Sequence, residues 1–366
     1  MLRPDPQMYM RMALRLARRG EGNISPNPMV GAVIVKNGKV VGKGYHKYFG
    51  GPHAEVEAIK NAGVKAKGAT LFVTLEPCSH FGKTPPCTQA IIKAGIKKVV
   101  AATFDPNPLN RGKAFEILKE AGIDTEVGVL EEEAKKVNQY FFKYISTKIP
   151  YVTVKAATSL DGKIATFKGE SKWITSERSR RWGKKLRDKV DAILVGINTV
   201  MKDDPELLPL KNKKRYLRVV LDTHLKIPLG AKILEQQSNF PTLIFTGSHT
   251  GIDKMKVLTE KGVGVKIVEE KEGRVNLGKV LQELGKMEIA SLLVEGGGEV
   301  IASFIKENQV DELFLFLSPC IIGGKEAPTW VEGEGFCLLK DATKVKIESI
   351  RRVGEDVLLR GKVLSI

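Results

Sequence analysis

The chain has 366 residues, of which 42% are hydrophobic and 28% charged, and no apolar run is long enough to cross a bilayer. This length and composition predict a soluble protein of two domains and exclude an integral membrane protein. The net charge of +17 is spread over both halves without a long polybasic run, so it fits an enzyme for an anionic small molecule as well as a nucleic-acid binder. Four cysteines are too few and too clustered for a disulfide framework, which predicts a reducing compartment and hence the cytoplasm.

The N-terminal segment is basic and amphipathic, but the residues at its two ends favour an ordinary helix over a targeting peptide. Asp5 suits an N-cap, Pro6 the first helical position and Gly20 a C-terminal stop. The segments that follow are predicted to be a hairpin over 29–45 with Asn37-Gly38 at its turn, a helix over 53–62, a strand over 69–76, a helix over 88–95 and a strand over 97–103. This order implies a βαβ unit with partly parallel pairing.

A helical segment over 130–148, followed by Pro150, ends the first region. We therefore expect one domain over 1–147 and a second α/β domain over 148–366. After an opening segment at 151–166, the second domain is predicted to contain strands at 191–196, 217–222, 242–247, 290–296 and 312–319, and helices at 178–189 and 299–307.

Three metal-ligand side chains and a carboxylate lie in two short motifs of the first domain. "PHAE" contains His53 and Glu55, and "PCSHFGKTPPC" contains Cys78 and Cys87. Three protein ligands are typical of catalytic zinc, since structural sites are closed by four. Glu55 is too close to His53 to be an obvious further ligand and is placed to move protons, which is what hydrolytic deamination by a zinc-activated hydroxide needs.

Two other interpretations of these residues stay open. His80 as a fourth ligand would make the site structural, and a single Cys or His is more often a packed or satisfied side chain. Cys320 and Cys337 are predicted to be packed thiols.

The motifs "HAE" and "PCSHFGKTPPC", with "SPNPMVGAVIV" and "YHKYFGGPHAE", resemble the deaminase domain of bifunctional riboflavin-biosynthesis deaminase-reductases, within the cytidine-deaminase superfamily. The eight residues between the cysteines, in place of two, point away from nucleoside and nucleic-acid deaminases. The resemblance implies a cytidine-deaminase-like α/β/α fold, Zn²⁺ on His53, Cys78 and Cys87, and Glu55 as proton shuttle. It also implies that the pyrimidine or phosphate of the substrate contacts Asn27, His46 and Lys83.

In the second domain, three glycines separate a predicted strand from a predicted helix in "SLLVEGGGEVIASFIKE". Such a turn lets a phosphate approach backbone N–H groups at the positive end of a helix, although tight turns also use glycine for steric reasons. The spacing is not G-x-G-x-x-G, so a dinucleotide-binding Rossmann motif is not predicted.

The segments "SLDGKIA", "ESKWITS", "VGINTVMKDDP", "RVVLD" and "VEGGGEV" together resemble the reductase domain of the same family, which is similar in fold to dihydrofolate reductase. The resemblance implies that NADPH is bound by Ala157, Trp173, Thr199, Asp203, Thr223, Gly296, Gly297 and Gly298. It implies substrate binding by Ser171, Arg187 and Glu295, with Arg187 on the ribose phosphate. Lys155 is the candidate for polarising the sugar carbon or donating a proton.

One position departs from the family pattern D-D-P-x-L-T-x-R. This chain reads "DDPELLPLK", which places Leu210 where the family has an arginine that faces the substrate. Lys211 offers a charge from the next position but lacks the planar fork of arginine.

The expected function is therefore a two-step enzyme of riboflavin biosynthesis. Zinc-hydroxide deamination of 2,5-diamino-6-(5-phosphoribosylamino)pyrimidin-4(3H)-one is followed by NADPH reduction of the ribosyl side chain to ribityl. The partner is this small phosphorylated pyrimidine, with no nucleic acid and no membrane, and we expect a homo-oligomer.

Two alternatives remain. A deaminase acting on bases in nucleic acid would leave the second domain unexplained and has few aromatic side chains near the zinc loop for stacking. A zinc-stabilised interaction module would leave Glu55 without a task.

Overall fold

The structure is a computed structural model that describes residues 5–82, 85–211 and 216–364. It divides into two compact units, Met1–Lys148 and Ile149–Ile366, so the division falls next to the boundary expected at 147. No helix in the described parts of the chain has the length and apolar character needed to span a membrane. The two units are described separately.

The first unit is built on a five-stranded sheet with the order β2-β1-β3-β4-β5. Its strands are β1 (Gly31–Lys36), β2 (Lys39–Tyr45), β3 (Thr70–Val73), β4 (Lys98–Ala101) and β5 (Asp124–Val127). Strand β1 runs antiparallel to both β2 and β3, whereas β3, β4 and β5 are parallel. Asn37 and Gly38 both have positive φ, as a tight hairpin turn requires, so the predicted hairpin is confirmed.

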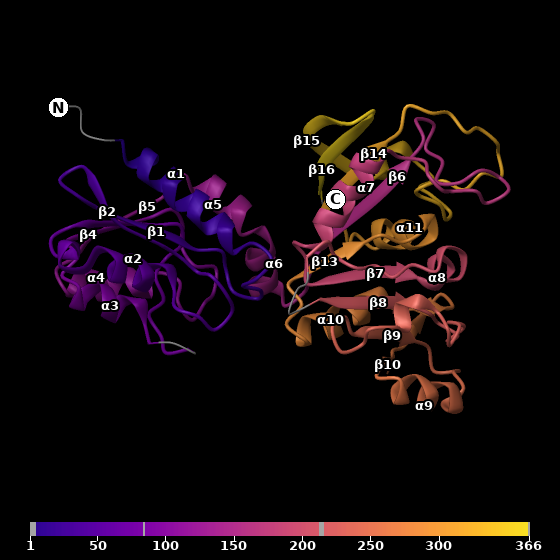
Figure 1. Ribbon diagram of the computed structural model, residues 1–366, viewed down its shortest axis with the longest axis horizontal. Helices are drawn as coiled ribbons and strands as arrows, with labels where there is room; N and C mark the ends of the chain where they lie inside the picture. Colours follow the sequence, from indigo (N-terminus) through magenta and orange to yellow (C-terminus); the bar gives the residue numbers. More distant parts are fainter. Residues whose placement is uncertain (1–4, 83–84, 212–215, 365–366) are drawn as a thin grey trace. The chain divides into compact units, whose positions relative to one another are not determined.

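Helices cover both faces of this sheet and give the predicted α/β/α layers (Figure 1). They are α1 (Pro6–Ala17), α2 (Ala54–Ala62), α3 (Cys87–Lys93), α4 (Lys113–Glu120), α5 (Glu131–Val137) and α6 (Gln139–Thr147), with short 3-10 turns at Arg18–Gly20 and Gly63–Ala66. Helices α1 and α5 pack on one face, and α2, α3 and α4 on the other. The Asp5 side chain accepts a hydrogen bond from the backbone N–H of Gln7, which confirms the predicted cap of α1.

Glycines on β2 allow α2 to lie directly on the strand. A Cβ atom at Gly44 would lie 2.2 Å from the carbonyl oxygen of Ala54, and one at Gly42 would lie 2.4 Å from that of Ala58. Side chains at these positions would push the helix away from the sheet. The close approach therefore fixes the start of α2, which His53 caps.

The single helical segment predicted over 130–148 is two helices, α5 and α6, separated at Asn138. The Asn138 side chain accepts from the backbone N–H of Met29 at 2.7 Å and donates to the Met29 carbonyl at 2.9 Å. Asn138 is buried and has a non-helical backbone, with φ −106°. Pairing with a segment 109 residues away accompanies the break in the helix, and the local apolar pattern carries no sign of it.

The second unit is built on a nine-stranded sheet with the order β10-β9-β8-β7-β13-β6-β14-β16-β15. Its strands are β6 (Tyr151–Thr158), β7 (Ala192–Gly196), β8 (Leu217–Leu221), β9 (Thr242–Thr246), β10 (Gly264–Ile267), β13 (Ser291–Val294), β14 (Glu312–Leu317), β15 (Lys344–Val353) and β16 (Asp356–Leu364). Pairing is parallel from β10 to β14 and antiparallel through β16 to β15. A separate pair is formed by β11 (Glu270–Lys271) and β12 (Arg274–Val275).

Two apolar cores lie on opposite faces of this sheet. The helices are α7 (Glu177–Arg187), α8 (Ile197–Asp203), α9 (Ile252–Glu260), α10 (Leu277–Lys286) and α11 (Gly298–Lys306), with 3-10 turns at Lys232–Leu234 and Leu339–Asp341. Helices α10 and α11 contribute to one core, and α7, α8 and α9 to the other. Because the strands are parallel, the loops after β6, β7, β8 and β13 meet at one edge of the sheet.

We predict that Gly44→Ala destabilises the first unit by about 2 kcal/mol, because the added Cβ overpacks against α2. Chemical denaturation followed by circular dichroism measures the change. Gly82→Ala is the matched control, since no described atom lies within 4 Å of a Cβ there. Equal stability of the two variants would contradict the role assigned to Gly44.

Candidate active sites

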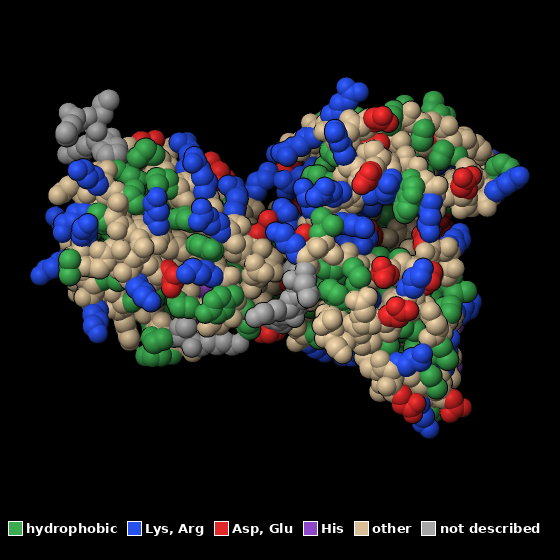
Figure 2. All heavy atoms as spheres, in the orientation of Figure 1, with side chains coloured by type: hydrophobic (Ala, Val, Ile, Leu, Met, Phe, Trp, Pro, Cys, Tyr) green, Lys and Arg blue, Asp and Glu red, His purple; other side chains and the backbone are tan. Residues whose placement is uncertain are grey.

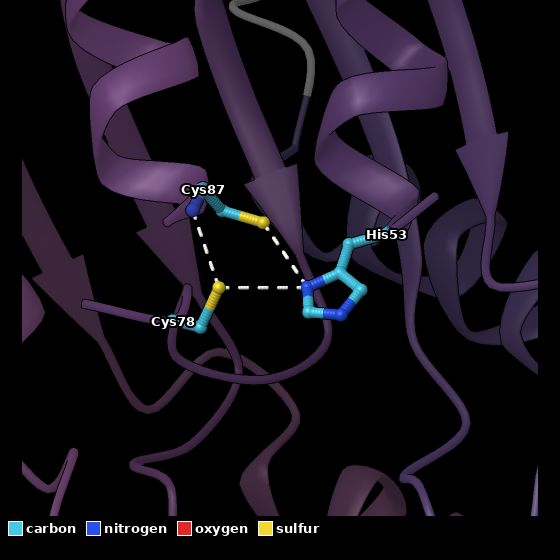
Figure 3. A group of neighbouring side chains, drawn as sticks. All are labelled: His53, Cys78 and Cys87. Atoms are coloured by element: carbon cyan, nitrogen blue, oxygen red, sulfur yellow. Dashed lines mark hydrogen bonds between the residues drawn. The ribbon is translucent and has the colours of Figure 1, made fainter. Parts of the chain in front are cut away.

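His53, Cys78 and Cys87 form the one group of metal-ligating side chains found among the described residues of the chain. One ligand atom from each lies within 4.8 Å of the others. His53 Nδ1 is 3.2 Å from Cys87 Sγ and 3.5 Å from Cys78 Sγ, and the three side chains point toward one another (Figure 3). The structure thus brings together the three ligands predicted from the sequence.

The three ligands come from three different segments of the first unit. His53 is the N-cap of α2, and Cys87 is the first residue of α3, after Pro86. Cys78 lies in the loop after β3, and its sulfur accepts a hydrogen bond from the Cys87 backbone N–H at 3.2 Å. Two helix N-termini therefore favour negative charge at the cluster.

The two thiols have opposite pKa shifts. Hydrogen bonding with the Cys87 thiol lowers the pKa of Cys78 against the opposing effect of burial, and the same contact raises the pKa of Cys87. The His53 pKa is raised, chiefly by its hydrogen bond with Cys78. A divalent cation displaces such protons when it binds.

The donor set and its spacing fit zinc. Tetrahedral zinc with nitrogen and sulfur ligands places neighbouring donor atoms roughly 3.5 Å apart. His80, the alternative fourth ligand, is exposed and is not a member of the group formed by the described residues. Three ligands leave a position for water or substrate, as in catalytic sites.

Glu55 lies in the first turn of α2, two residues after His53, and is only 3% exposed. Burial raises the pKa of this carboxyl to about 7, with a smaller opposing effect of His53 and a smaller reinforcing effect of Cys78. A carboxyl group that titrates near neutral pH can both accept and release a proton during one reaction.

His46 and Asn27 lie beside the cluster. The His46 and His53 rings meet edge to face with centroids 5.3 Å apart. His46 Nδ1 is 3.0 Å from the Pro52 carbonyl, and Nε2 is 3.2 Å from Asn27 Nδ2. Burial lowers the His46 pKa. The third predicted substrate contact of this unit, Lys83, lies outside the described residues.

A buried polar network that the sequence does not indicate lies next to Cys78. Its members are Glu76, Asp105 and Asn110, all less than 9% exposed. The stretch "FDPNPLN" carries turn signals, but nothing in it shows which distant residues its side chains contact.

In the second unit, a cavity of about 1090 Å³ opens where the loops after the parallel strands meet. Its lining includes the catalytic candidate Lys155 and nine of the residues predicted to bind NADPH or substrate: Ala157, Ser171, Thr199, Asp203, Thr223, Glu295, Gly296, Gly297 and Gly298. Trp173 and Arg187 are not among the lining residues. Trp173 is 68% exposed, with the Arg180 guanidinium 4.4 Å from its ring centroid.

Different local features explain why glycine stands at positions 296, 297 and 298. A Cβ at Gly296 would lie 2.8 Å from Val300, and one at Gly298 would lie 2.4 Å from the Thr329 carbonyl oxygen. Gly297, the N-cap of α11, has open space, with Thr199 Oγ1 at 3.9 Å from such a Cβ. Backbone at the N-terminus of α11 is therefore accessible to an anionic group in the cavity.

Glu295 forms ion pairs with two cationic side chains at the cavity wall. Its carboxylate accepts from Arg187 Nε and Nη2, each at 3.0 Å, and lies 3.6 Å from Lys155 Nζ. Arg187 also donates to the Leu208 carbonyl at 3.1 Å. Burial alone would raise the Glu295 pKa, but Arg187 and Lys155 outweigh it and hold this pKa at about 2.

Neither Leu210 nor Lys211 lines the cavity. Leu210 is 45% exposed, and the Lys211 backbone N–H donates to Asp188 Oδ1 at 2.9 Å. The segment is thus attached to the end of α7, next to Arg187.

We predict that Glu295→Gln destabilises the second unit by roughly 3 kcal/mol at neutral pH, because it leaves Arg187 and Lys155 without their carboxylate. The folded pKa of about 2 lies below the unfolded value of about 4.3, so the carboxylate stabilises the fold above that unfolded value. This contribution is lost as the pH falls toward 2, and the difference between the variant and the wild type should shrink over that window.

Urea denaturation at several pH values measures this difference. Glu299→Gln is the control, since Glu299 pairs with Arg274 at an exposed position, where an ion pair contributes about 0.5 kcal/mol. A loss no larger in Glu295→Gln than in the control would contradict the prediction.

Two family models match the chain. The cytidine and deoxycytidylate deaminase zinc-binding region matches residues 4–103, and the RibD C-terminal domain matches residues 150–359. The riboflavin biosynthesis protein RibD of Aquifex aeolicus is 47% identical over 361 residues, which is 98% of this chain and 99% of that protein.

Solved structures of RibD proteins are similar to this chain over nearly its full length. RibD of Acinetobacter baumannii is 37% identical with a TM-score of 0.88, and covers 98% of this chain and 99% of its own. A diaminohydroxyphosphoribosylaminopyrimidine deaminase/5-amino-6-(5-phosphoribosylamino)uracil reductase from Thermotoga maritima is 37% identical with a TM-score of 0.86 and the same coverage. These matches confirm a cytidine-deaminase-like first unit and a dihydrofolate-reductase-like second unit. The chain therefore belongs to the RibD family of bifunctional riboflavin-biosynthesis enzymes, in which a zinc-dependent deaminase precedes a reductase that uses NADPH.

Proposed function

We propose that the two units act in succession on one substrate. The first removes the 2-amino group of 2,5-diamino-6-(5-phosphoribosylamino)pyrimidin-4(3H)-one, and the second reduces the ribosyl side chain of the product to give 5-amino-6-(5-phosphoribitylamino)uracil. The name of the Thermotoga maritima relative, which specifies these two pyrimidine activities, supports the choice of substrate. The observation that carries the deaminase half is the buried Glu55 carboxyl beside the His53, Cys78 and Cys87 cluster.

In the deaminase unit, His53 Nδ1 and the sulfurs of Cys78 and Cys87 would hold zinc. When bound, zinc supplies a nucleophilic water at neutral pH. Glu55 accepts a proton at its carboxylate and delivers it to the amino nitrogen, which leaves as ammonia while a carbonyl replaces it on the ring. Its raised pKa, due mainly to burial, suits it to both steps.

Asn27 and His46 orient the pyrimidine in this proposal. The position of the two side chains supports this role. His46 packs against the ligand His53, and Asn27 lies within hydrogen-bonding distance of His46. Lys83 is proposed to bind the phosphate of the substrate, on the ground that a cation between two ligand cysteines suits an anionic molecule.

In the reductase unit, the cavity holds NADPH and the sugar together. NADPH supplies the hydride. The phosphates of the cofactor bind near Gly297 and Thr199, and the remaining proposed cofactor contacts are Ala157, Trp173, Asp203, Thr223, Gly296 and Gly298. The glycine turn at the start of α11 supports this placement.

The sugar lies on the Lys155 side of the cavity. Lys155 lines the cavity and its ammonium group pairs with Glu295, so we assign it proton donation to the sugar oxygen that becomes a hydroxyl when the hydride adds to the sugar carbon. Ser171 and Glu295 contact the substrate. Arg187 stays the proposed partner of the substrate phosphate: it does not itself line the cavity, and three of its five N–H donors are used by Glu295 and Leu208, which leaves two for the phosphate.

We also propose that the chain acts in the cytoplasm and not on nucleic acid. The Cys78 and Cys87 thiols must stay reduced to bind a metal, which a reducing compartment ensures. Lys and Arg side chains are interspersed with Asp and Glu on the visible faces of the two units, in place of one continuous basic stripe (Figure 2). A diffuse charge of this kind suits a small anionic substrate.

The experiment that tests the proposal is incubation of the zinc-loaded chain with the diamino-pyrimidine phosphate and NADPH, followed by mass spectrometry. We expect the deaminated intermediate to form without NADPH and the ribityl product only with it. Absence of both products would overturn the assignment.

We predict that Glu55→Gln lowers the deamination rate by roughly 10²–10⁴-fold, because it removes the proton carrier. Zinc content, measured by atomic emission, stays at the wild-type level, and reduction of the pre-deaminated substrate is unchanged. Glu57→Gln is the control, since Glu57 pairs with Lys47 at 2.6 Å, away from the ligand atoms. Deamination retained in Glu55→Gln would remove Glu55 from the mechanism.

The homo-oligomer is proposed from the edge strand β15. Ile347 and Ile350 on this strand are 46% and 67% exposed, and a terminal strand of a sheet can pair with a second copy. Light scattering is expected to give a mass of at least two chains, and Ile350→Lys is expected to lower it. A monomer over the whole concentration range would contradict the proposal.

A further inference from the structure

We propose that Asn110 is a positioning residue for the metal ligand Cys78, acting through the peptide groups on both sides of it. This inference rests on the proposed role of Cys78 in binding zinc. Asn110 lies in the loop between β4 and α4 and is fully buried. It is not one of the metal-ligating residues, and its side-chain hydrogen bonds go to Pro77, Ser79 and Asp105 and not to the Cys78 sulfur.

The Asn110 side-chain amide forms hydrogen bonds with the peptide groups before and after Cys78. Its Oδ1 accepts from the Ser79 backbone N–H at 2.8 Å and from Ser79 Oγ at 2.6 Å. Its Nδ2 donates to the Pro77 carbonyl at 3.1 Å and to Asp105 Oδ2 at 3.1 Å. The carbonyl before Cys78 and the N–H after it are thus both fixed by one side chain.

The four contacts use the full hydrogen-bonding capacity of the amide, two donors and two acceptor sites. They also determine its orientation, because exchanging oxygen and nitrogen would set Oδ1 against the Pro77 carbonyl and Nδ2 against the Ser79 N–H. An amide is required here: aspartate could not donate to Pro77 and would place a second carboxylate beside Asp105.

The loop that carries Asn110 is itself anchored to the residue two before Cys78. The Glu76 carboxylate accepts from the backbone N–H groups of Asp105, Gly112 and Ala114 at 3.0 to 3.2 Å. The loop of Asn110 and the Cys78 segment are therefore tied together at Glu76 and at Asn110.

This arrangement matters because Cys78 is the one ligand without a helix to hold it. His53 and Cys87 are set by the starts of α2 and α3, whereas residues 76–79 belong to no helix or strand. Fixing both peptide groups of Cys78 fixes the direction of its Cα–Cβ bond and so the place of its sulfur. Partners that orient metal ligands are typically worth 10–100-fold in metal affinity.

The test measures the zinc affinity of the full chain by competition with a chromogenic chelator. Asn110→Ala and Asn110→Asp are expected to bind zinc 10–100-fold more weakly than the wild type. Ser79→Ala keeps the backbone contact and is expected to change affinity less than threefold, which is about 0.6 kcal/mol. Asn107→Ala is the matched control, since the Asn107 side chain contacts the Leu109 N–H in the same loop.

A merely structural role predicts a different result. In that case Asn110→Ala lowers the unfolding midpoint of the metal-free and zinc-loaded forms equally and leaves zinc affinity unchanged. That outcome, or failure of both Asn110 variants to fold with or without zinc, overturns the proposal. Reductase activity on pre-deaminated substrate should stay at the wild-type level.

The Cys78→Ser variant distinguishes a wrong ligand assignment for Cys78 from a wrong role for Asn110. If this variant keeps wild-type zinc affinity, the ligand assignment in the proposed function fails. If it loses zinc while both Asn110 variants keep it, the inference about Asn110 alone is wrong.

Discussion

Both candidate sites depend on one constraint, the meeting of loops and helix starts at the carboxyl edge of parallel strands. In the first unit the loop after β3 and the N-termini of α2 and α3 gather Cys78, His53 and Cys87. In the second unit the turns after β7, β8 and β13 surround the cavity. Helix N-termini at this edge favour anions, which suits thiolates in one unit and phosphates in the other.

Buried charge is handled differently in the two sites. Hydrogen bonding with Cys87 lowers the pKa of Cys78, and the start of α3 favours negative charge there, so the cysteine pair favours a cation. Glu295 is instead balanced within the chain by Arg187 and Lys155. The first site is therefore organised to take up a metal, whereas the second keeps a permanent ionic group on its wall while the backbone at Gly297 stays open to a ligand.

The sequence was sufficient wherever the information is local. The hairpin at Asn37-Gly38 and the cap at Asp5 lie within short segments, as do the two motifs that carry His53, Cys78 and Cys87, and the structure agrees with each. Long-range pairing was not accessible in this way. The Asn138 contact with Met29 spans 109 residues and the Arg187 pair with Glu295 spans 108, so no local pattern shows them.

The same limit explains what the sequence does not show around Trp173 and Asn110. Trp173 stays a proposed cofactor contact, and its exposed ring contacts Arg180, a neighbour that is set by the fold. Asn110 lies in a stretch rich in turn residues, and only the approach of the loop after β3 gives its amide four partners.

The position of Asn138 bears on how a free-standing deaminase can be made from this chain. The zinc-binding region recognised by its family model ends at residue 103. Asn110 and Asn138 both lie beyond that point, yet one holds the backbone on either side of Cys78 and the other holds Met29, two residues after Asn27. A shortened protein that stops at the family boundary would keep every ligand and lose these two supports. A deaminase unit that keeps both supports must therefore extend at least to Asn138, 35 residues past the last residue that the family model matches.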